Sequence, residues 1–233
     1  MTKIIFLFLI FTLPSFSADL KKETMVAALT FDDGPNPEFL KNALPYLEKE
    51  NVKATFFVIG FKAKKYPDFI DKMFKSGHEI ANHSMNHVCL VRPSPKWSGC
   101  PDLSEEKAIK EVNDASLAIQ KITGKKPSFL RPPHFAMTPS RKNAIEESLG
   151  IKVLIHGSNS VGSLDWSFND KNKIFNQVKK TITERNFKPV VIVFHERNVT
   201  LEALPEIIKF MREAGYKFVT LEEFVKIAPK ANI

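Results

Sequence analysis

Short apolar runs alternate with helical patterns along most of this chain. Residues 190–194 form a continuous apolar run, and 54–59 form another with one threonine in it. Such runs are typical of strands that are covered on both faces. Seven strands are predicted in all, at 26–32, 54–59, 79–81, 129–131, 152–156, 190–194 and 217–220. Helical patterns separate the strands. They are predicted at 38–50 with a break or kink at Pro45, before Gly77 with Pro67 in the first turn, after Ser104 up to Gly124, at 139–149 between the caps Thr138 and Gly150, at 170–186, over 201–215 and from 221 on. Residues 157–163 are predicted to be a loop rich in Ser and Gly. The sequence therefore predicts an α/β fold with a parallel sheet, either closed as a barrel or open and doubly wound.

The first 17 residues have the pattern of an export signal. Lys3 is followed by an apolar stretch over 4–13 and by Ser15-Phe16-Ser17, which has small residues where a cleavage site needs them. This stretch and every later one are shorter than the roughly 20 apolar residues of a membrane helix. We therefore expect a signal peptide at 1–17 and one domain at 18–233, secreted or periplasmic and without membrane insertion. An uncleaved anchor is the alternative.

The charge of the chain bears on its partners. The 233 residues carry a formal net charge of +8, which favours an acidic surface or polymer as partner. Nucleic acid is disfavoured because no run of Arg and Lys is interleaved with aromatic residues. Cys89 and Cys100 flank a loop that contains Pro and Gly, and in an oxidising compartment such a pair is expected to form a disulfide rather than a metal site.

Polar residues follow several of the predicted strands. Asp32 and Asp33 end the first one, next to Gly34-Pro35, and Arg131 and His195 end two later ones. Since the carboxyl ends of parallel strands meet at one rim, these side chains are expected to lie close together. Two adjacent carboxylates also require a positive charge nearby, although a solvated turn would explain the Asp pair equally well.

His83 and His87 are four residues apart, which would place both imidazoles on one face if the segment is helical. Two histidines and a carboxylate leave one coordination position open, as in catalytic zinc sites. Each residue alone also has an ordinary interpretation. His195 could be a hydrogen-bonded core histidine, Arg131 a surface arginine, and Asp165-Trp166 a surface turn beside a core aromatic residue.

Five segments stand out when the chain is taken in order: Thr30-Phe31-Asp32-Asp33-Gly34-Pro35, His83-Ser84-Met85-Asn86-His87, Arg131-Pro132-Pro133, Asp165-Trp166 and Val193-Phe194-His195. Together they resemble the pattern of a known family, the polysaccharide deacetylases with a NodB-homology domain, carbohydrate esterase family 4. The resemblance covers about residues 26–225 and implies a single-domain distorted (β/α)7 barrel of parallel strands.

The resemblance also implies roles for individual residues. Asp33, His83 and His87 would hold one divalent metal ion, with zinc as the default and cobalt, nickel or iron as alternatives. The catalytic residues implied are Asp32 as general base, Arg131 as its ion-pair partner, His195 as general acid and Asp165 beside His195. Those implied to contact substrate are Trp166 and Val193 around the acetyl methyl group, together with Pro133 and a backbone N–H near His134.

Four positions depart from the family pattern. His134-Phe135 replaces Tyr-Gly, Gly162 replaces an Asp, Val193 replaces a Leu and Glu196 replaces an Asp. None of these changes removes an implied metal ligand, base or acid, so they bear on the choice of substrate.

The sequence is thus interpreted as an exported, metal-dependent hydrolase that removes N-acetyl groups from N-acetylglucosamine of peptidoglycan or a related amino-sugar polymer. A glycan-binding protein on an inactive deacetylase scaffold is one alternative, and hydrolysis of a small amide or imide is another. His134 and His156 are expected to be structural or substrate-shaping, and His78 to lie at the far end of the barrel.

Overall fold

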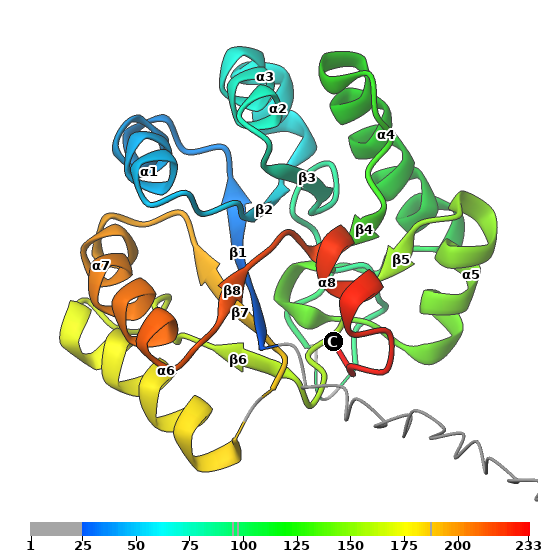
Figure 1. Cartoon of the computed structure of the whole chain (residues 1–233). Helices are drawn as coiled ribbons and strands as arrows, with labels where there is room; N and C mark the ends of the chain where they lie inside the picture. The colour runs from blue at the N-terminus through cyan, green and yellow to red at the C-terminus, as the bar shows by residue number, and fades with distance from the viewer. Residues whose placement is uncertain (1–24, 95, 97, 187) are drawn as a thin grey trace, which may run out of the picture.

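The computed structural model describes residues 25–94, 96, 98–186 and 188–233 (Figure 1). The predicted signal peptide at 1–17 lies outside the described residues. Among those described, eight strands form one sheet, in which every pairing is parallel. The strands are β1 (Val26–Gly34), β2 (Thr55–Val58), β3 (Glu79–Asn82), β4 (Phe129–Leu130), β5 (Lys152–Val153), β6 (Ser160–Gly162), β7 (Val190–His195) and β8 (Lys217–Phe218).

The strand order is β5-β4-β3-β2-β1-β7-β6, with β8 paired to β1. Figure 1 shows the sheet curling around the chain's last helix, with the other helices on its outside. The predicted distorted barrel of parallel strands is therefore confirmed. One element was missed, because 157–163 was interpreted as a loop rich in Ser and Gly, whereas Ser160–Gly162 pairs with β7. Pairing with a long buried strand overrides its weak local preference.

The helices follow the predicted positions, with two corrections. The helix expected before Gly77, with Pro67 in its first turn, is present as α3 (Pro67–Lys75), but the short α2 (Gly60–Lys65) before it was missed. The two are separate because proline disfavours helical backbone at Tyr66 (φ −130°, ψ 57°). An interruption or kink was expected at Pro45, but Pro45 lies inside one continuous helix. The helices are α1 (Pro37–Lys49), α2 (Gly60–Lys65), α3 (Pro67–Lys75), α4 (Glu105–Thr123), the 3-10 turn η2 (Pro133–Phe135), α5 (Pro139–Leu149), α6 (Lys171–Arg185), α7 (Asn198–Glu213) and α8 (Leu221–Ile227).

Two apolar layers hold the helices to the sheet. Along β7, Ile192 and Phe194 belong to the outer core between strands and helices, whereas Val191 belongs to a smaller inner core. This alternation is the period of two that a strand imposes on its side chains. Leu221 and Phe224 of α8 pack into the inner core, so the last helix closes one end of the barrel.

The end closed by α8 is the one at which the strands begin. The backbone N–H of Leu221 donates to Thr55 Oγ1 at 2.9 Å, and Thr55 is the first residue of β2. His78, immediately before β3, is buried and accepts a hydrogen bond from the backbone N–H of Ala54 at 3.1 Å. His78 therefore lies at the far end, as predicted, and the opposite end of the barrel is open for chemistry.

The cysteines form the predicted disulfide, Cys89–Cys100. Both are buried and pack with Val91 against Ala136, which follows η2. The bridge closes a loop between β3 and α4, and its packing against Ala136 brings the segment after His87 into contact with the loop after β4. No helix in the described parts of the chain is long and apolar enough to cross a membrane.

Candidate active site

Four parallel strands deliver polar side chains to one rim of the sheet. Asp32 and His195 are directly paired neighbours near the ends of β1 and β7. His83 follows β3, and its backbone N–H donates to Val58 at the end of β2. Arg131 follows β4, and its backbone N–H donates to Asn82. The strand ends predicted to meet do meet, because neighbouring parallel strands end at the same edge.

Asp33, His83 and His87 converge on one point. Asp33 Oδ1 lies 3.2 Å from His83 Nε2 and 3.0 Å from His87 Nε2. The segment between the two histidines is not helical, as the i, i+4 argument assumed. Instead it turns sharply, with positive φ at Ser84 (62°) and His87 (56°), and these turns bring the imidazoles together.

The three side chains fit a metal ion. One carboxylate and two imidazoles are a donor set that zinc and similar metals prefer, and one ligand atom from each lies within 4.8 Å of the others. Asp33 Oδ1 is buried without a hydrogen-bond partner among the described residues. His83 Nδ1 lies 2.7 Å from the backbone oxygen of Arg131, which fixes the tautomer that leaves Nε2 free to coordinate.

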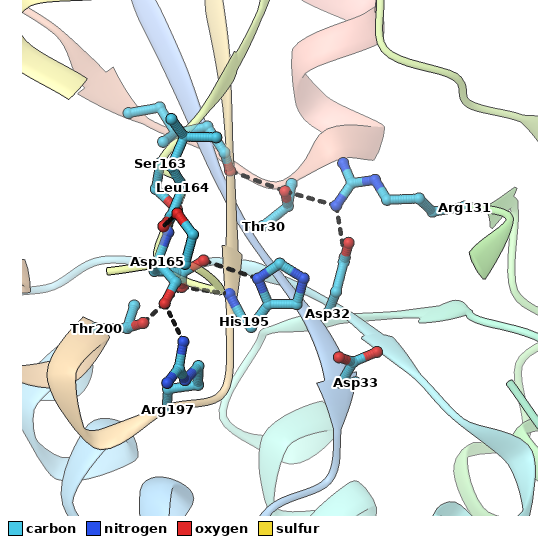
Figure 2. Close-up of polar contacts among 12 residues, drawn as sticks. Thr30, Asp32, Asp33, Arg131, Ser163, Leu164, Asp165, His195, Arg197 and Thr200 are labelled. Atoms are coloured by element: carbon cyan, nitrogen blue, oxygen red, sulfur yellow. Dashed lines mark hydrogen bonds and ion pairs between the residues drawn. The ribbon is translucent and has the colours of Figure 1, made fainter. Parts of the chain in front are cut away.

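Asp32 and Arg131 form a buried ion pair beside this cluster. Arg131 Nη1 donates to Asp32 Oδ1 at 2.6 Å and to Thr30 Oγ1 at 2.9 Å, and both charged residues are 3% exposed (Figure 2). The guanidinium also lies 4.0 Å above the ring of Phe57. The counter-charge predicted for the Asp pair is thus Arg131, held so that it reaches Asp32.

His195 is oriented by Asp165. Asp165 Oδ1 lies 2.7 Å from His195 Nδ1, and Oδ2 accepts the backbone N–H of His195 at 2.7 Å. Burial favours the neutral imidazole, but the hydrogen bond and charge of Asp165 outweigh it and raise the pKa of His195. In Figure 2 the other ring nitrogen points away from Asp165, toward the side that holds Asp32.

These groups open into a cavity of about 680 Å³. Two of the residues implied to contact substrate, Trp166 (66% exposed) and His134, line it. Pro133 and Val193 are buried and are not among the lining residues; Pro132 and Phe135 are. Val193 has the same parity on β7 as His195, so its side chain lies on the inner face beneath that histidine.

Several residues of the site were missed. Lys62 and Asn36 line the cavity, and Lys62 Nζ donates to the backbone oxygen of Asp33 at 2.8 Å. Arg197 also lines it and donates to the backbone oxygen of Asp165. Thr200 Oγ1 donates to Asp165 Oδ2 at 2.5 Å. These four residues come a few positions after the ends of predicted strands. That closeness was the only feature of the sequence that could have indicated their place in the site.

Of the other histidines, His134 belongs to the site and His156 does not. The ring centroids of His134 and His87 lie 4.9 Å apart. The backbone of His134 has a positive φ of 57°. His156 is exposed, lies 5.5 Å from Phe135 between ring centroids, and does not line the cavity.

Comparison with known proteins identifies the family. Residues 19–154 match the family model described as polysaccharide deacetylase. The chain is 32% identical to the peptidoglycan-N-acetylmuramic acid deacetylase PdaC of Bacillus subtilis over 89% of its length, and spans 41% of that protein. It is 28% identical to a peptidoglycan-N-acetylglucosamine deacetylase of Bacillus cereus, covering 86% of this chain and 88% of that one.

Solved structures agree with these matches. The structure of PdaC superposes with a TM-score of 0.74 at 30% identity, covering 89% of this chain and 93% of that one. A family 4 acetyl xylan esterase from Clostridium thermocellum, in complex with a cobalt ion, gives a TM-score of 0.73 at 28% identity and covers 88% of this chain and 92% of that one. This chain therefore belongs to the polysaccharide deacetylase family.

Proposed function

We propose that this protein is an exported, metal-dependent hydrolase that removes N-acetyl groups from amino sugars of peptidoglycan, with N-acetylglucosamine as the first candidate. The observation that carries the proposal is the convergence of the Asp33, His83 and His87 cluster with Asp32 and His195 on one open cavity. Secretion or a periplasmic location would bring the enzyme to this substrate, and the net charge of +8 suits an acidic polymer.

Asp33, His83 and His87 would hold the metal ion, with zinc as first choice and cobalt, nickel or iron as substitutes. A divalent ion bound there would supply Lewis acidity toward oxygen ligands and make water more acidic. Coordination would also satisfy Asp33 Oδ1, the buried oxygen that has no hydrogen-bond partner among the described residues.

Asp32 and His195 would move the protons. Asp32, ion-paired with Arg131, would accept the proton of the attacking water. His195, held by Asp165 in a form that favours the imidazolium, would give its proton to the leaving amine. Base and acid would thus come from directly paired positions on two neighbouring strands.

The remaining roles concern the substrate. Trp166 would stack on a sugar ring at the mouth of the cavity, where its indole is exposed. Val193 and Pro133 are buried and do not line the cavity, so they would shape the acetyl pocket through their neighbours. A backbone N–H near His134 would stabilise the oxyanion. Peptidoglycan is the substrate of the PdaC and Bacillus cereus relatives by their names, and this is the support for that polymer here.

Mass spectrometry of defined glycan fragments tests the proposal. The mature protein with added zinc is expected to remove one acetyl group, 42 mass units, from peptidoglycan fragments, and a chelator should stop the loss. The same panel includes chito-oligosaccharides and acetylated xylan. Asp32→Asn should abolish turnover and leave glycan binding intact. If the wild-type protein bound these fragments and released no acetate, the inactive-scaffold alternative would replace the proposal.

A further inference from the structure

We propose that a second cavity beside the active site binds a carboxylate of the peptide that branches from a peptidoglycan strand; this inference rests on the proposed function. The cavity, called the side cavity below, has a volume of about 390 Å³ and lies where the loop after Val91 meets the first turn of α5. Its polar lining consists of Arg92, Ser94, Glu105, Thr138, Ser140 and Arg141.

Arg141 is a buried charge that has no carboxylate in direct contact among the described residues, although the charge of Glu105 acts on it from farther away. It is 7% exposed, and its guanidinium donates only to two backbone oxygens, those of Ser104 at 2.9 Å and Leu103 at 3.3 Å. Within the described parts of the chain, no carboxylate lies within 4.0 Å of it. Buried charges are normally paired, and a guanidinium has five N–H donors, so Arg141 can bind an anion that enters the cavity.

The neighbours of Arg141 suit the same ligand. Ser94 Oγ is buried without a hydrogen-bond partner among the described residues, and so has a free donor. Thr138 and Ser140 lie at the N-terminus of α5, whose first turn favours negative charge. Arg92 is exposed and only loosely paired with Asp102, at 3.6 Å. Against two guanidinium groups the lining has one carboxylate, that of the exposed Glu105.

The side cavity lies within reach of the catalytic one. Val91 is four residues after His87, and Thr138 is four residues after His134, while both histidines line the catalytic cavity. Four residues span at most about 14 Å. The disulfide packs against Ala136 and holds these two segments together. Because an extended tripeptide reaches about 10 Å, a peptide on a sugar next to the catalytic cavity can place a carboxylate on Arg141.

A purely structural role explains less. By binding Leu103 and Ser104, Arg141 ties the start of α4 to α5, which Figure 1 shows side by side. Those two bonds leave the positive charge unpaired and do not account for the free hydroxyl of Ser94. An uncharged donor could hold the same two backbone oxygens, so the charge itself points to a ligand.

Two substrates that differ only in charge test the proposal. One is a peptidoglycan fragment that carries a tripeptide with free carboxylates, and the other is the same fragment with those carboxylates amidated. We expect the wild-type kcat/KM to be about tenfold higher for the acidic fragment, mainly through KM, since hydrogen bonds to charged groups contribute this much. Arg141→Met should remove the difference and leave the amidated fragment unaffected.

Lys142→Gln is the matched control, since it removes one positive charge from the next residue of α5 and should keep the preference. If Arg141→Met unfolds the protein, the double variant Arg92→Gln with Ser94→Ala replaces it, and the preference should fall about threefold. The proposal would be overturned if Arg141→Met lowered kcat/KM equally for both fragments. It would also be overturned if the wild-type kcat/KM were the same for the acidic and the amidated fragment.

Binding of the free tripeptide separates this proposal from the deacetylase activity. Calorimetry in the presence of a chelator, which keeps the metal site empty, should detect tripeptide binding to wild type and Lys142→Gln but not to Arg141→Met. If the wild-type protein deacetylated neither fragment but showed this binding pattern, the proposed deacetylase function would be contradicted and the peptide site would stand. Binding of inorganic phosphate without the tripeptide, or of neither, would contradict the peptide site.

Discussion

The carboxyl group of Glu196 lies directly over the α-carbon of Gly34. Glu196 is 4% exposed, and a Cβ atom added at Gly34 would lie 1.8 Å from Glu196 Oε1. The other oxygen of the same carboxyl group accepts the backbone N–H of Asn36 at 2.5 Å. Glu196, next to His195, therefore fixes the turn that follows Asp32 and Asp33. Its carboxyl group leaves room only for glycine at position 34.

Gly34→Ala is expected to lower the free energy of unfolding by about 3 kcal/mol, because the new methyl group must displace a buried carboxyl group. Glu196→Ala in the same chain should restore part of that loss, with a coupling free energy above about 1 kcal/mol. Chemical denaturation of the four variants measures both quantities. Gly99→Ala, where nothing lies within 4 Å of the added atom, is the control and should be neutral. Additive effects would show that the two residues do not compete for space.

Asp165→Asn is expected to lower kcat by about 10²–10⁴-fold and to move the alkaline limb of the pH–rate profile to lower pH. Asp165 raises the pKa of His195, so without its negative charge His195 loses its proton at lower pH. The pH dependence of kcat measures the position of this limb, and the exposed Asp68→Asn should leave the profile unchanged. An unmoved limb would remove His195 as the general acid.

Removal of the metal is expected to abolish activity and to lower the melting temperature of the wild-type protein. An ion present at 100 times its dissociation constant stabilises the folded state by about 2.7 kcal/mol. For a protein of this size that corresponds to roughly 5–11 °C. His87→Ala should lose this response to chelator, and the exposed His156→Ala should keep it. A chelator effect of equal size in His87→Ala would place the ion elsewhere.

Glu79 is expected to make stability fall as the pH rises. Its Oε2 accepts hydrogen bonds from Thr55 Oγ1 at 2.8 Å and from the backbone N–H of Glu222 at 3.1 Å, whereas Oε1 is buried without a partner among the described residues. Burial raises the pKa of Glu79 from 4.5 to about 7. The folded state therefore binds a proton that the unfolded state has released, and this stabilisation is present below pH 4.5 and lost as the pH passes 7.

The loss attributable to Glu79 is at most about 3 kcal/mol between pH 4.5 and 8. Chemical denaturation across that range measures it, and Glu79→Gln should flatten this component because the amide does not titrate. Glu48→Gln, on the exposed face of α1, should preserve the wild-type slope. If Glu79→Gln kept the slope as well, another group would be responsible.

The sequence predicted those parts of the fold that depend on local pattern. Residues 190–194 were recognised as a buried strand because apolar side chains continue without interruption, and α5 was predicted with its observed bounds, Pro139–Leu149, because Thr138 and Gly150 cap it. Ser160–Gly162 was missed because its three residues become a strand only through pairing with β7. Neither length nor composition marks such a segment in advance.

The site shows the same division. Asp32, Arg131 and His195 were predicted to lie at one rim because each ends a predicted strand, and the carboxyl ends of parallel strands meet at the same edge of a sheet. Lys62, Arg197 and Thr200 were missed because their roles depend on where a helix or loop returns after the strand, which the sequence pattern does not reveal. The approach of His83 to His87 was predicted for a helix, whereas the structure achieves it with left-handed turns.

The position of β1 has a consequence for synthesis. This strand comes from the start of the described chain, yet it pairs with β7 and β8 from its end. Asp32 and Asp33 therefore leave the ribosome more than 160 residues before His195. Until β7 has been synthesised, β1 lacks this partner strand, so the polar side chains at the rim can assemble only after that point.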